Sequence, residues 1–248
     1  MPEVPEVKAV AADAKQAAVE VGKGRPGEIA RTWLWRLALV CLVLFVVDSY
    51  YVLSGTYTFF DRAVALFVQA LPWGPVVYLF NAFNSVFGIW QLVAGAAIAL
   101  LMAFWDRRAG WLMLIGAGAS GLDNLVKVLV ARQRPATDLV HVLSPATGYS
   151  FPSGHAVFYT WVAVMLAAAL APRLTPRARP FLWLTAALII LIACTARVYE
   201  GVHWPSDVLG GFLLAVAWCA FVLWVPERWL PTPSRTWLGR RSRRKVAA

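Results

Sequence analysis

Charged residues are scarce in this sequence: they make up 15% of 248 residues, whereas apolar residues make up 60%. A soluble domain has about 25% charged and 45–50% apolar residues. The shortage of charge argues against a disordered chain and against an ordinary soluble enzyme. The apolar residues form continuous runs rather than alternating ones, a pattern that favours membrane helices over a membrane β-barrel.

Cysteine and acidic residues are also few. The three cysteines, Cys41, Cys194 and Cys219, all lie within apolar runs, which excludes a disulfide-based scaffold and is typical of small buried side chains. The 13 acidic residues against 23 basic ones leave a net charge of +10. In a membrane protein such an excess marks cytoplasmic loops, so we expect a bilayer and no nucleic acid as partner.

The apolar runs predict an all-α integral membrane protein with six transmembrane helices and an additional interfacial amphipathic helix. The six predicted spans are 33–53, 76–105, 109–131, 154–171, 181–199 and 207–225. The run 76–105 is too long for one straight span, and we place its first part, 76–87, at the membrane interface. The segment 56–71 is amphipathic and too short to span, as expected of an interfacial helix.

Three regions follow from these spans. We expect a weakly ordered cytoplasmic N-terminal tail over 1–30, a membrane domain over 31–226 and a basic cytoplasmic tail over 227–248. With the N-terminus inside, all but five of the 23 Lys and Arg residues fall on the cytoplasmic side, which supports this orientation. The five exceptions are Arg62, Lys127, Arg132, Arg134 and Arg197, and all three histidines share their outer side. Ionisable residues kept at span ends against the prevailing bias predict a functional site.

The first of three outer-face segments is KVLVARQRP, from Lys127 to Pro135. Lys127 and Arg134 are seven residues apart, which is two helical turns, so they share a face if the helix persists. Asp123 lies one turn before Lys127 and is placed to pair with it. Two cations on one face suit a phosphate group, with Arg as a planar fork and Lys as a point charge.

The second segment is PSGH, from Pro152 to His155, at the outer start of the fourth span. Ser153 stands at the N-cap position, and Gly154 lets the backbone approach a ligand closely. A helix N-terminus of this kind binds anions. His155 falls within the same first turn.

The third segment, ARVYEGVHWPSD, runs from Ala196 to Asp207 between the last two spans. Arg197 adds another guanidinium fork. His203 and Asp207 are four residues apart, so the carboxylate can orient the imidazole and stabilise its cationic form. We expect no metal, because no carboxylate cluster or close histidine pair accompanies these cations.

Each segment alone also has a structural interpretation, as a lipid-headgroup anchor, an ordinary helix start or a structural His–Asp pair. Their conjunction is far more specific. The order Lys-x6-Arg-Pro, Pro-Ser-Gly-His, Arg-x5-His-x3-Asp resembles the signature of the type 2 phosphatidic acid phosphatase superfamily. The resemblance covers Lys127 to Asp207, and the six-span layout extends it. One departure is Ala196, which stands where the superfamily signature has Ser; its missing hydroxyl removes one hydrogen bond from the phosphate cradle and leaves the nucleophile in place.

The resemblance implies a mechanism without cofactor or metal. His203 would attack phosphorus, Asp207 would orient it, and His155 would protonate the leaving group and then activate water. Phosphate would be held by Lys127, Arg134, Ser153, Gly154 and Arg197. The substrates implied are phosphorylated lipids such as undecaprenyl diphosphate, phosphatidylglycerol phosphate or phosphatidic acid, and the location implied is a bacterial plasma membrane with the site on the outer face.

Two alternatives remain open at this stage. A phosphotransferase would resolve the same phosphohistidine with an alcohol instead of water, and the Ala196 departure motivates a non-catalytic lipid-binding protein. Vanadium haloperoxidases share the pocket signature, but they are soluble, and the mean hydropathy of +0.64 excludes them.

Overall fold

The computed structural model describes residues 26–55, 58–144 and 146–225, and these form helices and loops without a β-strand. The predicted tails lie outside the described residues, except that residues 26–30 already belong to the first helix. The elements are α2 (Pro26–Leu53), α3 (Thr58–Ala70), α4 (Val76–Ser85), α5 (Ile89–Trp105), α6 (Arg107–Gly116), α7 (Gly118–Val130), α8 (Gly154–Leu170), η1 (Ala171–Arg173), α9 (Arg179–Tyr199) and α10 (Pro205–Trp224). The expected all-helical architecture is confirmed.

Five stretches are long and apolar enough to cross a membrane: Arg31–Leu53, Arg107–Val130, Gly154–Arg173, Arg179–Tyr199 and Pro205–Trp224. The predicted run 76–105 is broken, because α4 and α5 meet at an angle of 88°. Gly88 lies in this break with φ of 54°, a left-handed conformation that glycine adopts without a side-chain clash. The described residues therefore carry five spans, or six if the bent pair counts as one.

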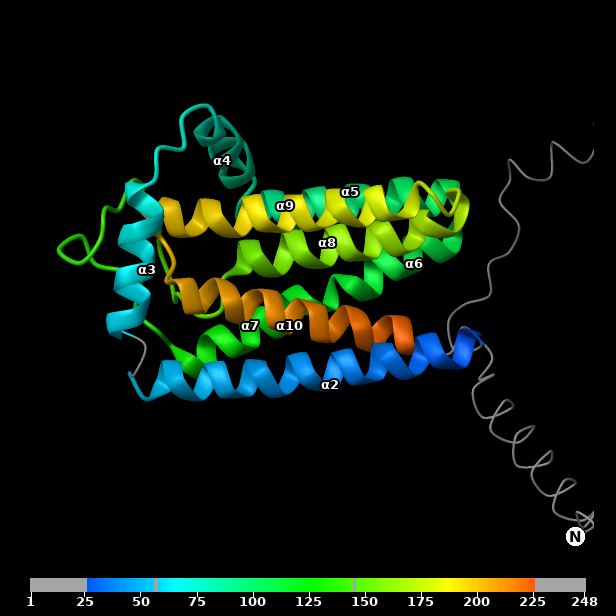
Figure 1. The fold of residues 1–248 in the computed structure, drawn as a ribbon, viewed down its shortest axis with the longest axis horizontal. Coiled ribbons are helices and arrows are strands. Elements are labelled where there is room, and N and C mark those ends of the chain that lie inside the picture. Colours follow the sequence, from blue (N-terminus) through cyan, green and yellow to red (C-terminus); the bar gives the residue numbers. More distant parts are fainter. Residues whose placement is uncertain (1–25, 56–57, 145, 226–248) are drawn as a thin grey trace, which may run out of the picture.

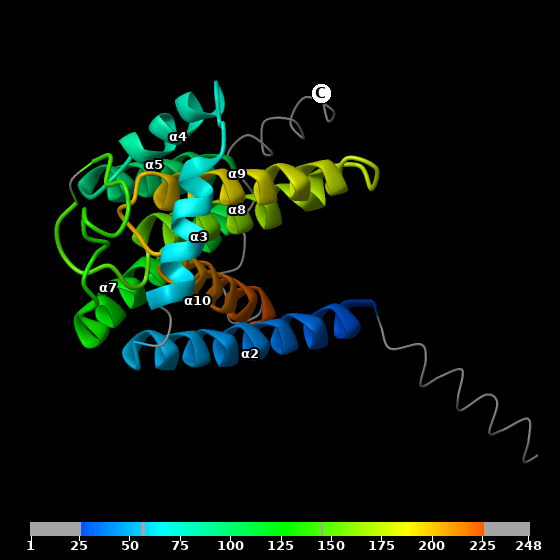
Figure 2. The same cartoon turned by 60° about the vertical axis from the view of Figure 1, so that its left-hand side comes forward.

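Helix α3 lies across one end of the bundle, over the ends of α2, α9 and α10 (Figures 1 and 2). Because α3 covers the end of the bundle, one of its faces is buried and the other is exposed. Asp61 and Ala65 are buried, whereas Phe59 and Phe67 are exposed. One face of α3, which includes Asp61 and Ala65, thus faces the bundle, and the aromatic side chains of Phe59 and Phe67 point outward.

The core is centred on α8 and α10, which are each buried over more than half of their span. Trp161 and Met165 of α8 and Ala215 and Cys219 of α10 are almost completely enclosed. Helix α2 runs alongside α10 (Figure 1) and exposes apolar residues on its outer side, Val46 at 58% for example. Such an apolar exterior is the surface expected to contact lipid.

The two central helices approach closely where α8 and α10 begin, and glycine makes room for this contact. A Cβ on Gly211 of α10 would lie 2.7 Å from the backbone oxygen of Ser153 and 3.0 Å from Cβ of Ala156. The backbone N–H of Ser153 also donates to the carbonyl of Asp207 at 2.8 Å. This contact fixes the start of α8 against the first turn of α10.

The Gly211→Ala variant should therefore lose stability, because the added methyl group meets backbone atoms that cannot rotate away. Overpacking of this kind costs about 1–3 kcal/mol, and 1 kcal/mol lowers the unfolding midpoint of a chain of this size by roughly 2–4 °C. The measurement is thermal unfolding in detergent. Gly121→Ala is the matched control, because a Cβ on Gly121 meets nothing within 4 Å; equal midpoints for the two variants would contradict the close approach.

Candidate active site

Lys127 and Arg134 reach the same cavity, but not through a shared helix face. Helix α7 ends at Val130, and Ala131 adopts the left-handed conformation with φ of 50°. The condition for a shared helix face, a helix that continues to Arg134, is therefore not met. Arg134 instead arrives from the loop that follows, and both side chains line one cavity.

Lys127 is held in place by two neighbours. Its Nζ forms an ion pair with Asp123, one turn earlier on α7, which confirms the predicted pairing. It also donates to the backbone carbonyl of Pro152 at 2.5 Å. The ammonium group thus lies at the junction between α7 and the segment that leads into α8.

The guanidinium of Arg134 is fixed mainly by backbone carbonyls. It donates to Val202 at 2.7 Å and to Thr147 and Gly148 at 3.1 Å. Burial lowers the pKa of Arg134, and the nearby Asp207 acts in the opposite direction. Because an arginine starts from a very high pKa, the group stays charged and is preoriented for an anion.

His203 is neutral at physiological pH. Burial lowers its pKa to about 3; Asp207 opposes this shift, whereas Arg197 and Arg134 add to it. The ring is 2% exposed and lies in the loop before α10. A group with a lowered pKa keeps its unprotonated form down to acidic pH, which is the form that a nucleophile requires.

The contacts of His203 also define its tautomer. Nη1 of Arg134 lies 3.2 Å from Nε2 of His203, and an arginine can only donate. Nε2 therefore presents its lone pair, and Nδ1 carries the hydrogen. Nδ1 faces Oδ2 of Asp207 at 3.5 Å, a distance at the outer limit of a hydrogen bond. The predicted His–Asp pair is present as this contact, although Nδ1 has no hydrogen-bond partner by strict geometry among the described residues, and the lone pair of Nε2 accepts from Arg134.

Asp207 is completely buried and is held by partners that the sequence patterns did not identify. Nη1 of Arg132 contacts its Oδ1 at 2.6 Å, while Nη2 of Arg132 contacts Asp61 at 2.6 Å. The hydroxyl of Ser150 and the backbone N–H of Trp204 donate to Oδ2. Arg132 had one sequence signal, since it is one of the five basic residues on the outer side. Asp61 had none, because its partners are distant in the sequence.

The PSGH segment opens α8 as predicted. Ser153 is the N-cap residue with an extended backbone, Gly154 begins the helix and His155 occupies its first turn. Oγ of Ser153 and Nε2 of His155 are both buried without a hydrogen-bond partner in the described part of the chain. Gly154 and His155 line the cavity, whereas Ser153 lies behind its wall.

Arg197 is buried at the end of α9 and is oriented by two side chains. Its Nη1 donates to Oδ1 of Asn84 at 2.9 Å and to Glu200 at 3.2 Å. Because arginine only donates, the Asn84 oxygen must face it, so Nδ2 of Asn84 points elsewhere. That Nδ2 and Nε of Arg197 have no partner among the described residues, although both are buried. Sequence reasoning missed Asn84, which stands at the end of α4.

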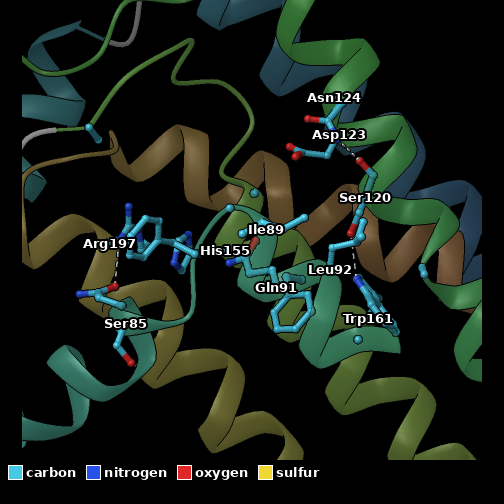
Figure 3. A pocket seen from close by; sticks show the side chains of 18 of the residues that line it. Ser85, Ile89, Gln91, Leu92, Ser120, Asp123, Asn124, His155, Trp161 and Arg197 are labelled. Atoms are coloured by element: carbon cyan, nitrogen blue, oxygen red, sulfur yellow. Dashed lines mark hydrogen bonds between the residues drawn. The ribbon is translucent and has the colours of Figure 1, made fainter. Parts of the chain in front are cut away.

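One cavity of about 1170 Å³ gathers these groups (Figure 3). Figure 3 shows His155 and Arg197 on one side and Ser120, Asp123 and Asn124 of α7 on the other. The predicted residues that line it are Lys127, Arg134, Gly154, His155, Arg197 and His203. Asp207 lies behind His203 and does not reach the cavity wall itself. In the described ranges, no group of three or more His, Cys, Asp or Glu side chains is arranged to hold a metal ion.

The departure from the signature at position 196 falls outside the cavity. Ala196 is completely buried in α9 and is not among the residues of the cavity wall. A hydroxyl at this position would therefore not point directly at a bound phosphate. The expectation that Ala196 removes one bond from the phosphate cradle is not supported by this geometry.

Comparison with known proteins matches residues 108–231, half of the chain, to the PAP2 superfamily. The chain is 33% identical over 129 residues to an undecaprenyl-diphosphatase from Sulfolobus acidocaldarius and 35% identical over 129 residues to phosphatidylglycerophosphatase B from Bacillus subtilis. These matches cover 50% of this chain and 58% and 60% of the relatives. The chain thus spans somewhat more than half the length of the curated relatives that it matches.

The fold has a counterpart among solved structures. The crystal structure of a transmembrane PAP2-type phosphatidylglycerolphosphate phosphatase from Bacillus subtilis superposes with a TM-score of 0.63 at 22% identity, covering 75% of this chain and 93% of that one. The likeness supports an integral membrane protein with this helical arrangement. Since the family match covers half of the chain and includes Lys127, Arg134, His155, Arg197 and His203, this chain belongs to the PAP2 superfamily.

Proposed function

We propose that the chain is a membrane phosphatase that hydrolyses the phosphomonoester or diphosphate of a lipid through a phosphohistidine. The observation that carries this proposal is the composition of the cavity of about 1170 Å³. One end holds three cationic side chains and two histidines, and the wall continues into apolar residues such as Ala99 and Leu114. An amphiphile with a phosphate at one end matches this division.

In the first step, Nε2 of His203 attacks phosphorus and the P–O bond to the leaving group breaks. His155 gives its proton to the departing oxygen. Lys127, Arg134 and Arg197 neutralise the charge on the remaining phosphoryl oxygens, as does the N-terminus of α8 at Gly154. Asp207 stabilises the positive charge that develops on His203.

In the second step, water attacks the phosphorus of the phosphohistidine. His155 takes a proton from this water, the P–N bond breaks and inorganic phosphate leaves. Every group used in the two steps belongs to the protein or the substrate, so the proposed reaction requires no metal ion or cofactor.

The proposed topology follows the charge distribution. The bent pair α4–α5 serves as one broken span, which makes six, and α3 lies at the outer interface over the active site. Both termini are cytoplasmic and the site opens on the outer face of a bacterial plasma membrane. The five basic residues on the outer side, from Arg62 to Arg197, fit this placement because four of them lie at or beside the cavity.

The central test is phosphate release from a panel of lipid phosphates and diphosphates by the full chain in detergent. His203→Ala should reduce turnover on the order of 10³-fold or more, because no other group can form the covalent intermediate. A chelator should leave wild-type activity unchanged. With a substrate that carries a radioactive phosphate, the wild-type protein should become labelled through an acid-labile phosphohistidine, and the His203→Ala variant should not.

His141→Ala is the matched control, since His141 is exposed and does not line the cavity. It should keep activity near the wild-type level. Turnover that survives in His203→Ala, or that depends on added metal, would refute the mechanism. Transfer of the phosphate to an added alcohol at the expense of hydrolysis would show a phosphotransferase instead.

Ala196→Ser restores the signature residue and should change kcat/KM by less than about threefold. The reason is that this position lies outside the cavity, so its hydroxyl would bond locally within the helix. Steady-state kinetics on the best substrate of the panel are sufficient. A tenfold gain would show that the hydroxyl acts on the phosphate after all.

Asn84→Ala should lower kcat/KM about tenfold or more, because Arg197 loses the acceptor that orients it and hydrogen bonds to charged groups are worth about 1.5–3 kcal/mol. Asn81→Ala, one turn earlier on the same helix and also on the cavity wall, is the matched control. Kinetics and thermal unfolding are measured together. Equal losses in the two variants would assign the effect to α4 as a whole rather than to the contact with Arg197.

A further inference from the structure

The cavity extends from the phosphate end along α7, and its lining changes in character with depth. Lys127 is followed one turn deeper by Asp123 and Asn124, and Ser120 comes one turn further. At 1.5 Å per residue these positions lie about 5–10 Å from Lys127 along the helix. Beyond them the wall becomes apolar. Along α7, polar side chains therefore lie between the phosphate end and the apolar end, while Phe158 and Trp161 of α8 line the same cavity.

The polar side chains of this zone leave hydrogen-bond acceptors facing the cavity. Nδ2 of Asn124 donates to the carbonyl of Ser120 at 2.9 Å, which leaves Oδ1. Nε2 of Gln91, on α5, donates to the carbonyl of Val86 at 3.1 Å, which leaves Oε1. Backbone carbonyls only accept, so both amide orientations are determined.

Asp123 contributes the third acceptor. Its Oδ1 pairs with Lys127, while its Oδ2 receives no hydrogen bond from any residue that the structure describes. The side chain is 7% exposed, and Oδ2 lies 3.1 Å from where a Cβ of Gly154 would be, beside the start of α8. Figure 3 shows Asp123 and Asn124 extending from α7 to the same side. An acidic residue within a span calls for a functional partner.

We propose that Asp123, Asn124 and Gln91 form a headgroup subsite that accepts hydrogen bonds from hydroxyl groups lying between the phosphate and the lipid chain of the substrate. This inference rests on the proposed phosphatase function and narrows its substrate class to the phosphomonoester of a hydroxylated headgroup, such as a glycerol or a sugar. These three acceptors receive no hydrogen bond from the described residues, so hydroxyl groups of a bound substrate can donate to them.

The charge of the subsite selects among the lipid phosphates. The carboxylate of Asp123 is already compensated by Lys127, so a neutral hydroxyl fits better than an ammonium group. A polyprenyl diphosphate would bring a second anionic phosphate next to this carboxylate and offers no hydroxyl. The subsite therefore disfavours diphosphates.

The test compares three substrates with the full chain in detergent: 1-palmitoyl-glycerol 3-phosphate, hexadecyl phosphate of the same chain length without the hydroxyl, and farnesyl diphosphate. The wild type should show its highest kcat/KM on the hydroxylated monoester. Asn124→Leu keeps the size of the side chain and removes the acceptor. It should lose roughly three- to tenfold on the hydroxylated monoester, the effect of one hydrogen bond, and less than twofold on hexadecyl phosphate.

Leu125→Ala is the matched control, because Leu125 is the next residue on α7, is 57% exposed and does not line the cavity. It should leave the ratio of the two monoesters unchanged. Equal losses of Asn124→Leu on both monoesters, or a wild-type preference for the diphosphate, would overturn the headgroup subsite while the phosphatase function stands. Release of phosphate from none of the three substrates would instead overturn the phosphatase function, and the subsite with it.

Discussion

The buried ion pair between Arg132 and Asp207 is the interaction on which the site depends. The carboxylate of Asp207 accepts hydrogen bonds from the loop after α7, from the segment before α8 and from the start of α10. The same Arg132 side chain also donates to Asp61 of α3. Removing one partner of such a pair costs about 3–5 kcal/mol, because the other charge stays buried and uncompensated. Segments that lie far apart in the sequence are thereby brought together at a single carboxylate, directly behind the histidine that it orients.

Helix α3 has a role in the fold in addition to the interfacial position that its sequence suggests. Its alternation of polar and apolar residues predicted a helix resting on the membrane surface. In the structure, the polar side of that helix includes Asp61, which accepts two bonds from Ser206 in addition to the contact with Arg132. The helix covers the end of the bundle and supplies part of the charge balance beneath the active site. A polar side chain has the same place in an amphipathic pattern whether it is buried in the protein or exposed to water. The pattern of α3 alone therefore could not show that Asp61 is buried.

How well each feature could be predicted from the sequence depends on how far apart its interacting residues are along the chain. Spans, the pairing of Asp123 with Lys127 and the spacing of His203 and Asp207 are local, so helical periodicity was sufficient to predict them. Whether Lys127 and Arg134 share a helix face was left conditional, because a single left-handed residue, Ala131, ends the helix and alanine gives no signal for that conformation. Asn84 was missed because its partner Arg197 is 113 positions away. Contacts of that range are determined by how helices pack, and one sequence carries no direct record of them.

The contact between Arg134 and Nε2 of His203 has a consequence for the empty enzyme. In the mechanism that we propose, the lone pair that performs the attack is engaged by a guanidinium N–H before the substrate binds, which shields it from stray electrophiles and from protons. An arriving phosphate offers the same guanidinium a far stronger acceptor. The N–H cannot serve both at full strength, so the arrival of the substrate releases the nucleophile. In this mechanism, Arg134 keeps the Nε2 lone pair of His203 occupied until the phosphate group of the substrate takes its place as the acceptor.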